Sequence, residues 1–123
     1  MVLLFRGSTH GWTPAQFHSL CDTNKGPSVT FIKSQAGKIF GGFTMQTWQE
    51  PACGYSRIDE KAMIFSIDNQ KVYKVVNSGF AKWCASGEGP SFGGNTLRIY
   101  SNPMNKQDGC DTMTNGEGNG DRY

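Results

Sequence analysis

Apolar and polar residues alternate in short runs along most of the chain, and this pattern predicts β-strands. In residues 28–34, Val29, Phe31 and Lys33 fall on one face of the predicted strand, while Thr30 and Ile32 fall on the other. The run at 62–68 is apolar almost throughout, which is typical of a central strand. Together these patterns predict strands at residues 2–6, 28–34, 38–46, 62–68, 71–76, 81–85 and 97–101.

Turn-forming residues separate the predicted strands and join two pairs of them into hairpins. Residues 35–37 form one such turn, and its glycine takes a positive φ easily. Asn69 and Gln70 form the second turn. Residues 49–59 are expected to be a loop, and 103–123 a polar, Gly-rich tail that is flexible at 115–120.

One segment instead carries the start signal of a helix. Thr13 is a good N-cap, Pro14 fits the first helical position, and Gln16 completes a capping box. The signal predicts a helix over about 14–21, which packs onto the sheet through the face that contains Phe17, Leu20 and Cys21.

Pairs of glycines interrupt two apolar segments. Gly41 and Gly42 lie inside the predicted strand 38–46, where glycine usually marks a bulge or the close approach of another backbone or ring. Gly93 and Gly94 end the segment 87–94, which lacks the Lys-Ser/Thr ending of a phosphate-binding loop. No acid, base or nucleophile lies between the glycines of either pair, so both are interpreted as structural, and residues 87–94 are interpreted as a structural loop.

Seven or so short antiparallel strands with hairpins predict a mostly β (α+β) fold, a two-sheet β-sandwich with one or two short flanking helices. At 123 residues the chain fits one domain, and no linker divides it. The large side chains expected to be mostly buried are Phe17, Phe31, Ile39, Phe65, Ile67 and Ile99.

Charge and composition exclude several classes of function. The formal net charge of +2 comes from scattered Lys and Arg residues, whereas a nucleic-acid-binding domain needs a concentrated basic face. The N-terminal apolar run ends at Arg6 and is too short for a signal peptide or a membrane span. The four cysteines lie far apart in the sequence, which favours reduced thiols in the cytoplasm or another intracellular compartment.

His18 and Cys21 are the strongest candidates for catalysis. They lie three residues apart on the predicted helix, so that the imidazole could activate the thiol as a nucleophile. Cysteine is also among the most buried residue types, and a structural role for Cys21 is therefore favoured. His10 lies in a predicted turn and nothing in the sequence places it near His18.

Acidic residues provide weaker candidates for a metal site. Glu50, Asp59 and Glu60 border the predicted loop without regular ligand spacing. Asp108 and Asp111 resemble the start of a calcium loop, but the required Gly and terminal Glu positions do not fit. No metal and no cofactor is expected.

Several segments occur in an order that is more specific than any one of them. In this order they resemble the TLDc domain, the module shared by the oxidation-resistance proteins and their relatives, over about residues 3–102. The segments are 3–8, 17–22, 25–27, 33–34, 37–44 with Trp48, 62–68, 89–94 and 97–101 with Asn102.

The resemblance assigns a structural role to individual positions of this chain. They are Arg6, Gly7, Phe17, Cys21, Asp22, Gly26, Pro27, Gly41, Gly42, Phe43, Trp48, Gly89, Pro90, Phe92, Gly93 and Gly94.

The resemblance also implies two antiparallel sheets, no established enzyme activity, and protein–protein interaction. Members of the family are linked to oxidative-stress protection and to the vacuolar-type proton ATPase. The chain departs from the family pattern before Leu3 and after the Gly-rich tail, where the family's closing strand is not found. An open sheet edge or apolar patch is therefore expected.

Two classes of function remain open at this point. The first is a non-catalytic interaction module that acts as an adaptor or as a subunit of a larger assembly. The alternative is a thiol-based antioxidant or hydrolase that uses Cys21 and His18.

Overall fold

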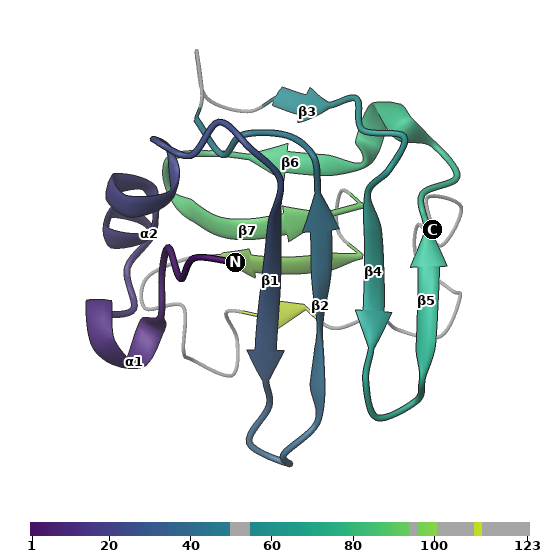
Figure 1. Ribbon diagram of the computed structural model, residues 1–123, viewed down its shortest axis with the longest axis horizontal. Coiled ribbons are helices and arrows are strands. Elements are labelled where there is room, and N and C mark those ends of the chain that lie inside the picture. Colours follow the sequence, from purple (N-terminus) through teal and green to yellow (C-terminus); the bar gives the residue numbers. More distant parts are fainter. Residues whose placement is uncertain (50–54, 94–95, 101–109, 112–123) are drawn as a thin grey trace.

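Two antiparallel β-sheets form within residues 1–49, 55–93, 96–100 and 110–111, which are the residues that the computed structural model describes. Sheet A has the strand order β1-β2-β4-β5, and sheet B has the order β3-β6-β7-β8-β9 (Figure 1). This arrangement confirms the predicted mostly β fold of two antiparallel sheets with short helices.

The strands of sheet A are β1 (Ser28–Lys33), β2 (Ile39–Thr44), β4 (Met63–Ser66) and β5 (Lys71–Lys74). The strands of sheet B are β3 (Tyr55–Arg57), β6 (Lys82–Cys84), β7 (Glu88–Phe92), β8 (Leu97–Tyr100) and β9 (Cys110–Asp111). The helices among the described residues are α1 (Gly7–His10), α2 (Pro14–Cys21) and the 3-10 turn η1 (Ser78–Phe80).

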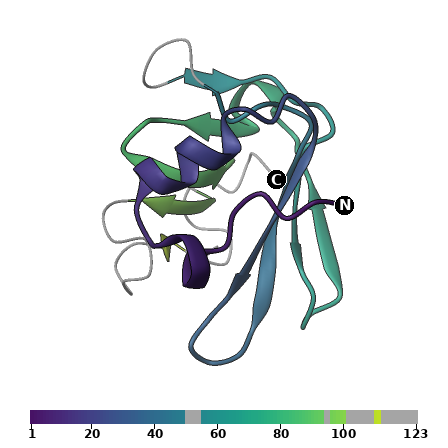
Figure 2. The same cartoon turned by 60° about the vertical axis from the view of Figure 1, so that its left-hand side comes forward.

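The sheets pack face to face with their strands crossing, and both α-helices lie on the side where β1 is the outermost strand (Figures 1 and 2). The hairpin turns are confirmed, with φ of 79° at Gly37 and 51° at Gln70. The core between the sheets and α2 is formed by Phe17, Cys21, Trp48, Ile64, Cys84, Phe92 and Leu97.

Gly42 allows the two sheets to approach closely. It pairs with the buried Ile64 of β4, so the side of Gly42 where a side chain would stand faces the core. The ring of Phe92 fills this space, and a Cβ on Gly42 would lie 2.6 Å from a ring carbon. Phe92 also meets Trp48 edge-on, with ring centroids 5.7 Å apart. The predicted close approach of a ring is confirmed here.

Gly41 has the corresponding role on the opposite face of sheet A, because successive residues of a strand face opposite sides. It pairs with Phe31 of β1 and Phe65 of β4. A Cβ on Gly41 would clash with the carbonyl oxygen of Thr30 and would lie 2.9 Å from Cζ of Phe65. The rings of Phe31 and Phe65 therefore meet across β2, with centroids 5.4 Å apart.

The helix α2 begins as the sequence predicts. The Gln16 N–H donates to Oγ1 of Thr13 at 3.2 Å, and the Thr13 N–H donates to Oε1 of Gln16 at 3.2 Å. These bonds satisfy two of the N–H groups that have no partner inside a helix. Phe17 and Cys21 are buried on the inner face of α2, whereas the prediction for Leu20 is wrong, because its side chain is exposed. Phe17 contacts Trp48, with ring centroids 5.4 Å apart.

The predicted strand at residues 2–6 is wrong. These residues pair with no described strand, and the helix α1 follows them. The local reason is a helical turn: the carbonyl oxygen of Arg6 accepts from the N–H groups of Thr9 and His10, and the Arg6 N–H donates to Nδ1 of His10. Phe5 is held by side-chain packing, with its ring 5.6 Å from that of Phe17.

The interpretation of residues 87–94 as a loop is also wrong over most of its length. They contain β7, which lies in the middle of sheet B between β6 and β8. The pairing of β7 with β8 shifts register between Glu88 and Ser91. This irregularity leaves Gly89 and Pro90 outside the paired positions, and a proline is tolerated in a strand at such a bulge.

Two further strands form where the sequence predicted none. β3 lies inside the predicted loop 49–59 and pairs with β6, and β9 lies in the predicted polar tail and pairs with β8. Both depend on a partner strand from elsewhere in the chain. The predictions for 115–120 and Gly94 fall outside the described residues.

The core predictions are partly correct. Phe17 is buried, whereas Ile39, Phe65 and Ile99 are only half-buried. The predictions for Phe31 and Ile67 are wrong, because their side chains are 57% and 51% exposed. The pairing of Phe31 with Gly41 places its ring on the outer face of sheet A, and Ile67 lies just beyond the end of β4.

Replacing Gly42 with alanine should reduce the free energy of unfolding by about 1–3 kcal/mol, because the new methyl group overlaps the buried ring of Phe92. The measurement is urea denaturation followed by tryptophan fluorescence. Gly87→Ala is the matched control, since nothing lies within 4 Å of a Cβ at that position.

The double variant Gly42→Ala/Phe92→Leu tests the cause. If the ring is responsible, the alanine should cost less in the Phe92→Leu background than in the wild type. Additive losses would show that the strain has another origin.

Candidate functional site

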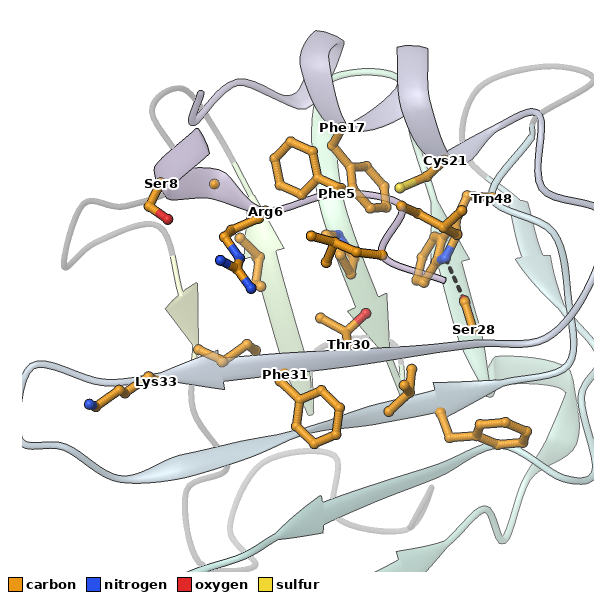
Figure 3. A pocket seen from close by; sticks show the side chains of 18 of the residues that line it. Phe5, Arg6, Ser8, Phe17, Cys21, Ser28, Thr30, Phe31, Lys33 and Trp48 are labelled. Carbon is orange, nitrogen blue, oxygen red and sulfur yellow. Dashed lines mark hydrogen bonds between the residues drawn. The ribbon is translucent and has the colours of Figure 1, made fainter. Parts of the chain in front are cut away.

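A groove between β1 and the N-terminal segment is the candidate site. The inner face of sheet A is closed at β4, where Ile64 is buried, but Thr30 and Ile32 of β1 are only half-buried. The groove has a volume of about 1520 Å³ and extends between β1 and residues 1–8 (Figure 3). This exceeds the roughly 300–1,000 Å³ of an ordinary small-molecule pocket, so the groove suits an extended occupant.

Apolar side chains form most of the walls of the groove. They include Phe5, Phe17, Ile32, Phe40, Trp48 and Ile99. Figure 3 shows Phe5 and Phe17 on the helical side and Thr30 pointing toward them from β1. The indole N–H of Trp48 donates to Oγ of Ser28 at 2.9 Å and so fixes one end of the groove.

The charged side chains of the groove are basic. Arg6 and Lys33 line it, and no Asp or Glu is found among its described lining residues. Arg6 points from the start of α1 toward β1 (Figure 3). A negatively charged group on the groove side would therefore meet Arg6 and no competing carboxylate among the described lining residues. Lys33 adds a second cation on the outer face at the end of β1, because it alternates with Thr30 and Ile32.

His18 is held in place by oxygen atoms. Its Nδ1 lies 2.8 Å from Oδ1 of Asp22, and its Nε2 lies 3.0 Å from the carbonyl oxygens of both Ala85 and Glu88. Nε2 thus joins α2 to the turn between β6 and β7, and Nδ1 is engaged by Asp22 at the end of α2 itself. This geometry leaves neither nitrogen directed at a thiol, and it explains His18 as a structural residue.

Cys21 lies in the core at 3% exposure. Burial, together with the nearby charge of Asp22, raises the pKa of the Cys21 thiol to about 11. Because the thiolate is the nucleophilic form, a thiol with this pKa is unreactive at neutral pH. Cys84 is buried too and donates from Sγ to the carbonyl oxygen of Trp48 at 2.7 Å.

The acidic candidates do not converge on a metal site. Asp59 is buried, and its carboxylate accepts from Oγ1 of Thr44 at 2.6 Å and from the N–H of Met45 at 2.7 Å. It therefore anchors the chain where β2 ends. Glu60 is exposed. Glu50, Asp108 and the side chain of Asp111 lie outside what is described, and no metal-binding group of three or more His, Cys, Asp or Glu residues occurs within it.

The residues assigned by family resemblance fall at core, strand and turn positions. Those in the core are Phe17, Cys21, Trp48 and Phe92. Those in or beside strands are Gly26 and Pro27 before β1, Gly41, Gly42 and Phe43 in β2, and Gly89 and Pro90 in β7. At helix ends and turns lie Arg6, Gly7, Asp22 and Gly93.

Sequence reasoning missed Lys82. This lysine is fully buried in β6, its Nζ donates to the carbonyl oxygen of Thr47, and it lies 4.3 Å from the centre of the Trp48 ring. A cation over an indole face is stabilised by the charge distribution of the ring. The available signal was the period-two pattern, which places Lys82 on the same face of β6 as the buried Cys84.

Cys21 should resist alkylation by iodoacetamide in the folded protein at neutral pH, because its raised pKa and its burial keep the thiol protonated and covered. Mass spectrometry of the Cys21 peptide provides the measurement, and the same protein in concentrated urea is the control in which alkylation should be rapid. Rapid modification of the folded protein would restore Cys21 as a candidate nucleophile.

Within the described residues, no helix combines the length and the apolar character needed to cross a membrane.

Comparison with known proteins gives one specific result. No curated protein matches the chain. The family model for the TLDc domain matches residues 1–117, which is nearly the whole sequence. The chain therefore belongs to the TLDc domain family.

Proposed function

We propose that this TLDc domain is a non-catalytic protein–protein interaction module that binds its partner at β1. The observation that carries the proposal is that both faces of this strand present apolar side chains to water. On the outer face Val29 and Phe31 are 37% and 57% exposed, and on the inner face Ile32 is half-buried in the open groove.

Exposed apolar side chains on a strand are unfavourable in free energy when no partner covers them. Burial of apolar surface stabilises by roughly 25 cal/mol for each Å² removed from water, and side chains that stay exposed do not gain this free energy. Contiguous apolar surface of this kind marks sites of protein interaction in soluble proteins. β1 combines such a surface with an apolar groove, so a partner could cover both at once.

The chemistry of the described side chains supports binding over catalysis. His18 is engaged by three oxygen atoms, and the pKa of Cys21 is raised to about 11. The alternative of a thiol-based antioxidant or hydrolase would need a more acidic and more accessible thiol.

The family membership suggests where the module acts. We infer a cytoplasmic protein that serves as an adaptor or as a subunit of a larger assembly, with the vacuolar-type proton ATPase as the first partner to test. A link to oxidative-stress protection would then follow from the assembly and not from chemistry at Cys21. The buried thiols of Cys21 and Cys84 support a reducing compartment.

Phe31→Glu should weaken binding to the purified vacuolar-type proton ATPase by about tenfold or more, because it places a charge in the centre of the exposed apolar surface. Biolayer interferometry with the immobilised domain measures the affinity. Val72→Glu is the matched control: Val72 has nearly the same exposure, 59%, but lies on β5 at the far edge of sheet A.

Both variants must retain the wild-type unfolding midpoint for the comparison to hold. If the domain does not bind the ATPase, that partner is wrong. Equal losses in the two variants would show that β1 is not the centre of the interface.

A further inference from the structure

The two edges of sheet A differ in their protection against pairing with another chain. β5 carries a lysine at each end, Lys71 and Lys74, and charged residues on an edge strand discourage pairing. β1 has a single lysine, Lys33, at its last position, and Val29, Phe31 and Ile32 among the five before it. β1 is therefore the edge open to strand addition.

The backbone of β1 has hydrogen-bonding groups directed away from β2. The Ser34 N–H donates to the carbonyl oxygen of Lys38 at 2.9 Å, and this pair continues the register of the β1–β2 ladder. Hydrogen-bonded pairs alternate along an antiparallel ladder. The N–H and C=O groups of Val29, Phe31 and Lys33 therefore face the other edge, with which no described strand pairs.

A strand added at this edge would find a place for its side chains on both faces. Side chains of a strand alternate between the two faces of the sheet. One set would continue the inner face beside Thr30 and Ile32 and enter the groove. The other set would continue the outer face beside Phe31, whose ring is exposed.

The charges in the groove restrict the sequence of such a strand. Arg6 and Lys33 are the charged side chains among its described lining residues. Both are positive, so the occupant should carry a carboxylate close to its apolar residues. A basic segment would be repelled.

We propose that β1 accepts an extended segment of a partner protein as an additional strand of sheet A, with apolar side chains in the groove, one carboxylate near Arg6 on the inner side and another near Lys33 on the outer face at the end of β1. The main chain supplies hydrogen bonds along the edge, and the groove selects the side chains. The inference rests on the interaction role proposed above and adds the form and chemistry of the bound segment.

The probe is a synthetic peptide slightly longer than the six residues of β1, in which Val and Thr alternate and Glu occupies both ends. Its binding to the intact domain is measured by fluorescence anisotropy of a label on the peptide. We expect saturable binding, and a peptide of the same composition interrupted by a central proline should bind at least about fivefold more weakly. No binding of the regular peptide would overturn the proposal.

Val29→Pro tests the main-chain contact in the domain. It removes an N–H that faces the open edge and leaves the ladder to β2 intact, a position at which edge strands tolerate proline. Binding of the peptide should weaken about fivefold or more. Val29→Ala is the matched control, because it also truncates the side chain but keeps the N–H, so Val29→Pro should bind the peptide at least about fivefold more weakly than Val29→Ala.

The unfolding midpoint of both variants must match that of the wild type. If Val29→Pro is not folded, the proline-interrupted peptide and the charge variants still decide the proposal. Lys33→Glu should weaken binding of the peptide and should reduce the dependence of the binding affinity on salt concentration. Lys74→Glu, on β5 at the far edge, should have little effect on either.

Other occupants give different results. Concentration-dependent dimers that disappear in Val29→Pro would identify a second copy of this chain as the occupant. Oleate that does not displace the peptide but binds wild type and Val29→Pro equally would identify a lipid. Either result would replace the proposal. If the vacuolar-type proton ATPase binds Val29→Pro as well as wild type, strand addition is wrong while the interaction role stands.

Discussion

The contact of Phe92 with Gly42 is the constraint on which the two-sheet structure depends. The missing side chain of Gly42 admits the ring, and that ring lies edge-on to Trp48, which in turn lies edge-on to Phe17 of α2. A single series of aromatic contacts thus joins β2, β7 and the helix. Lys82 covers the Trp48 ring from β6. Because protein interiors pack densely, a methyl group at position 42 would disturb every member of this series.

Within the described residues, the sandwich is closed over β2 and β4 and open beside β1. Phe92 fills the space between the sheets over β2, next to β4, where Ile64 is buried. On the other side of β2, the inner residues of β1 face the N-terminal segment, which packs through Phe5 and forms no strand. A segment attached only by side chains leaves both the groove and the backbone edge of β1 uncovered.

The parts of the fold that local chemistry determines could be predicted from the sequence. The capping box of Thr13 and Gln16, the turns at Gly37 and Gln70, and the two-sheet class all follow from neighbouring residues. β7 could not, because Gly89 and Pro90 indicate a loop until the register shift that accommodates them is known. The sequence also could not show whether Phe31 faces the core or water. Alternation along a strand separates its residues into two sets but does not tell which set faces sheet B. For the same reason the groove had no signal of its own.

The arrangement separates the residues that maintain the fold from those that remain for a partner. Phe92 and Ile64 are buried between the sheets, and any change there alters stability first. β1 is held by its ladder to β2, and its outward side chains contribute little burial to the folded domain. Apolar residues that do not stabilise the fold would be a liability in water unless another protein covers them. Under the proposed interaction role, Val29 and Phe31 are the side chains available to a partner, and substitutions there should change binding without disturbing the core.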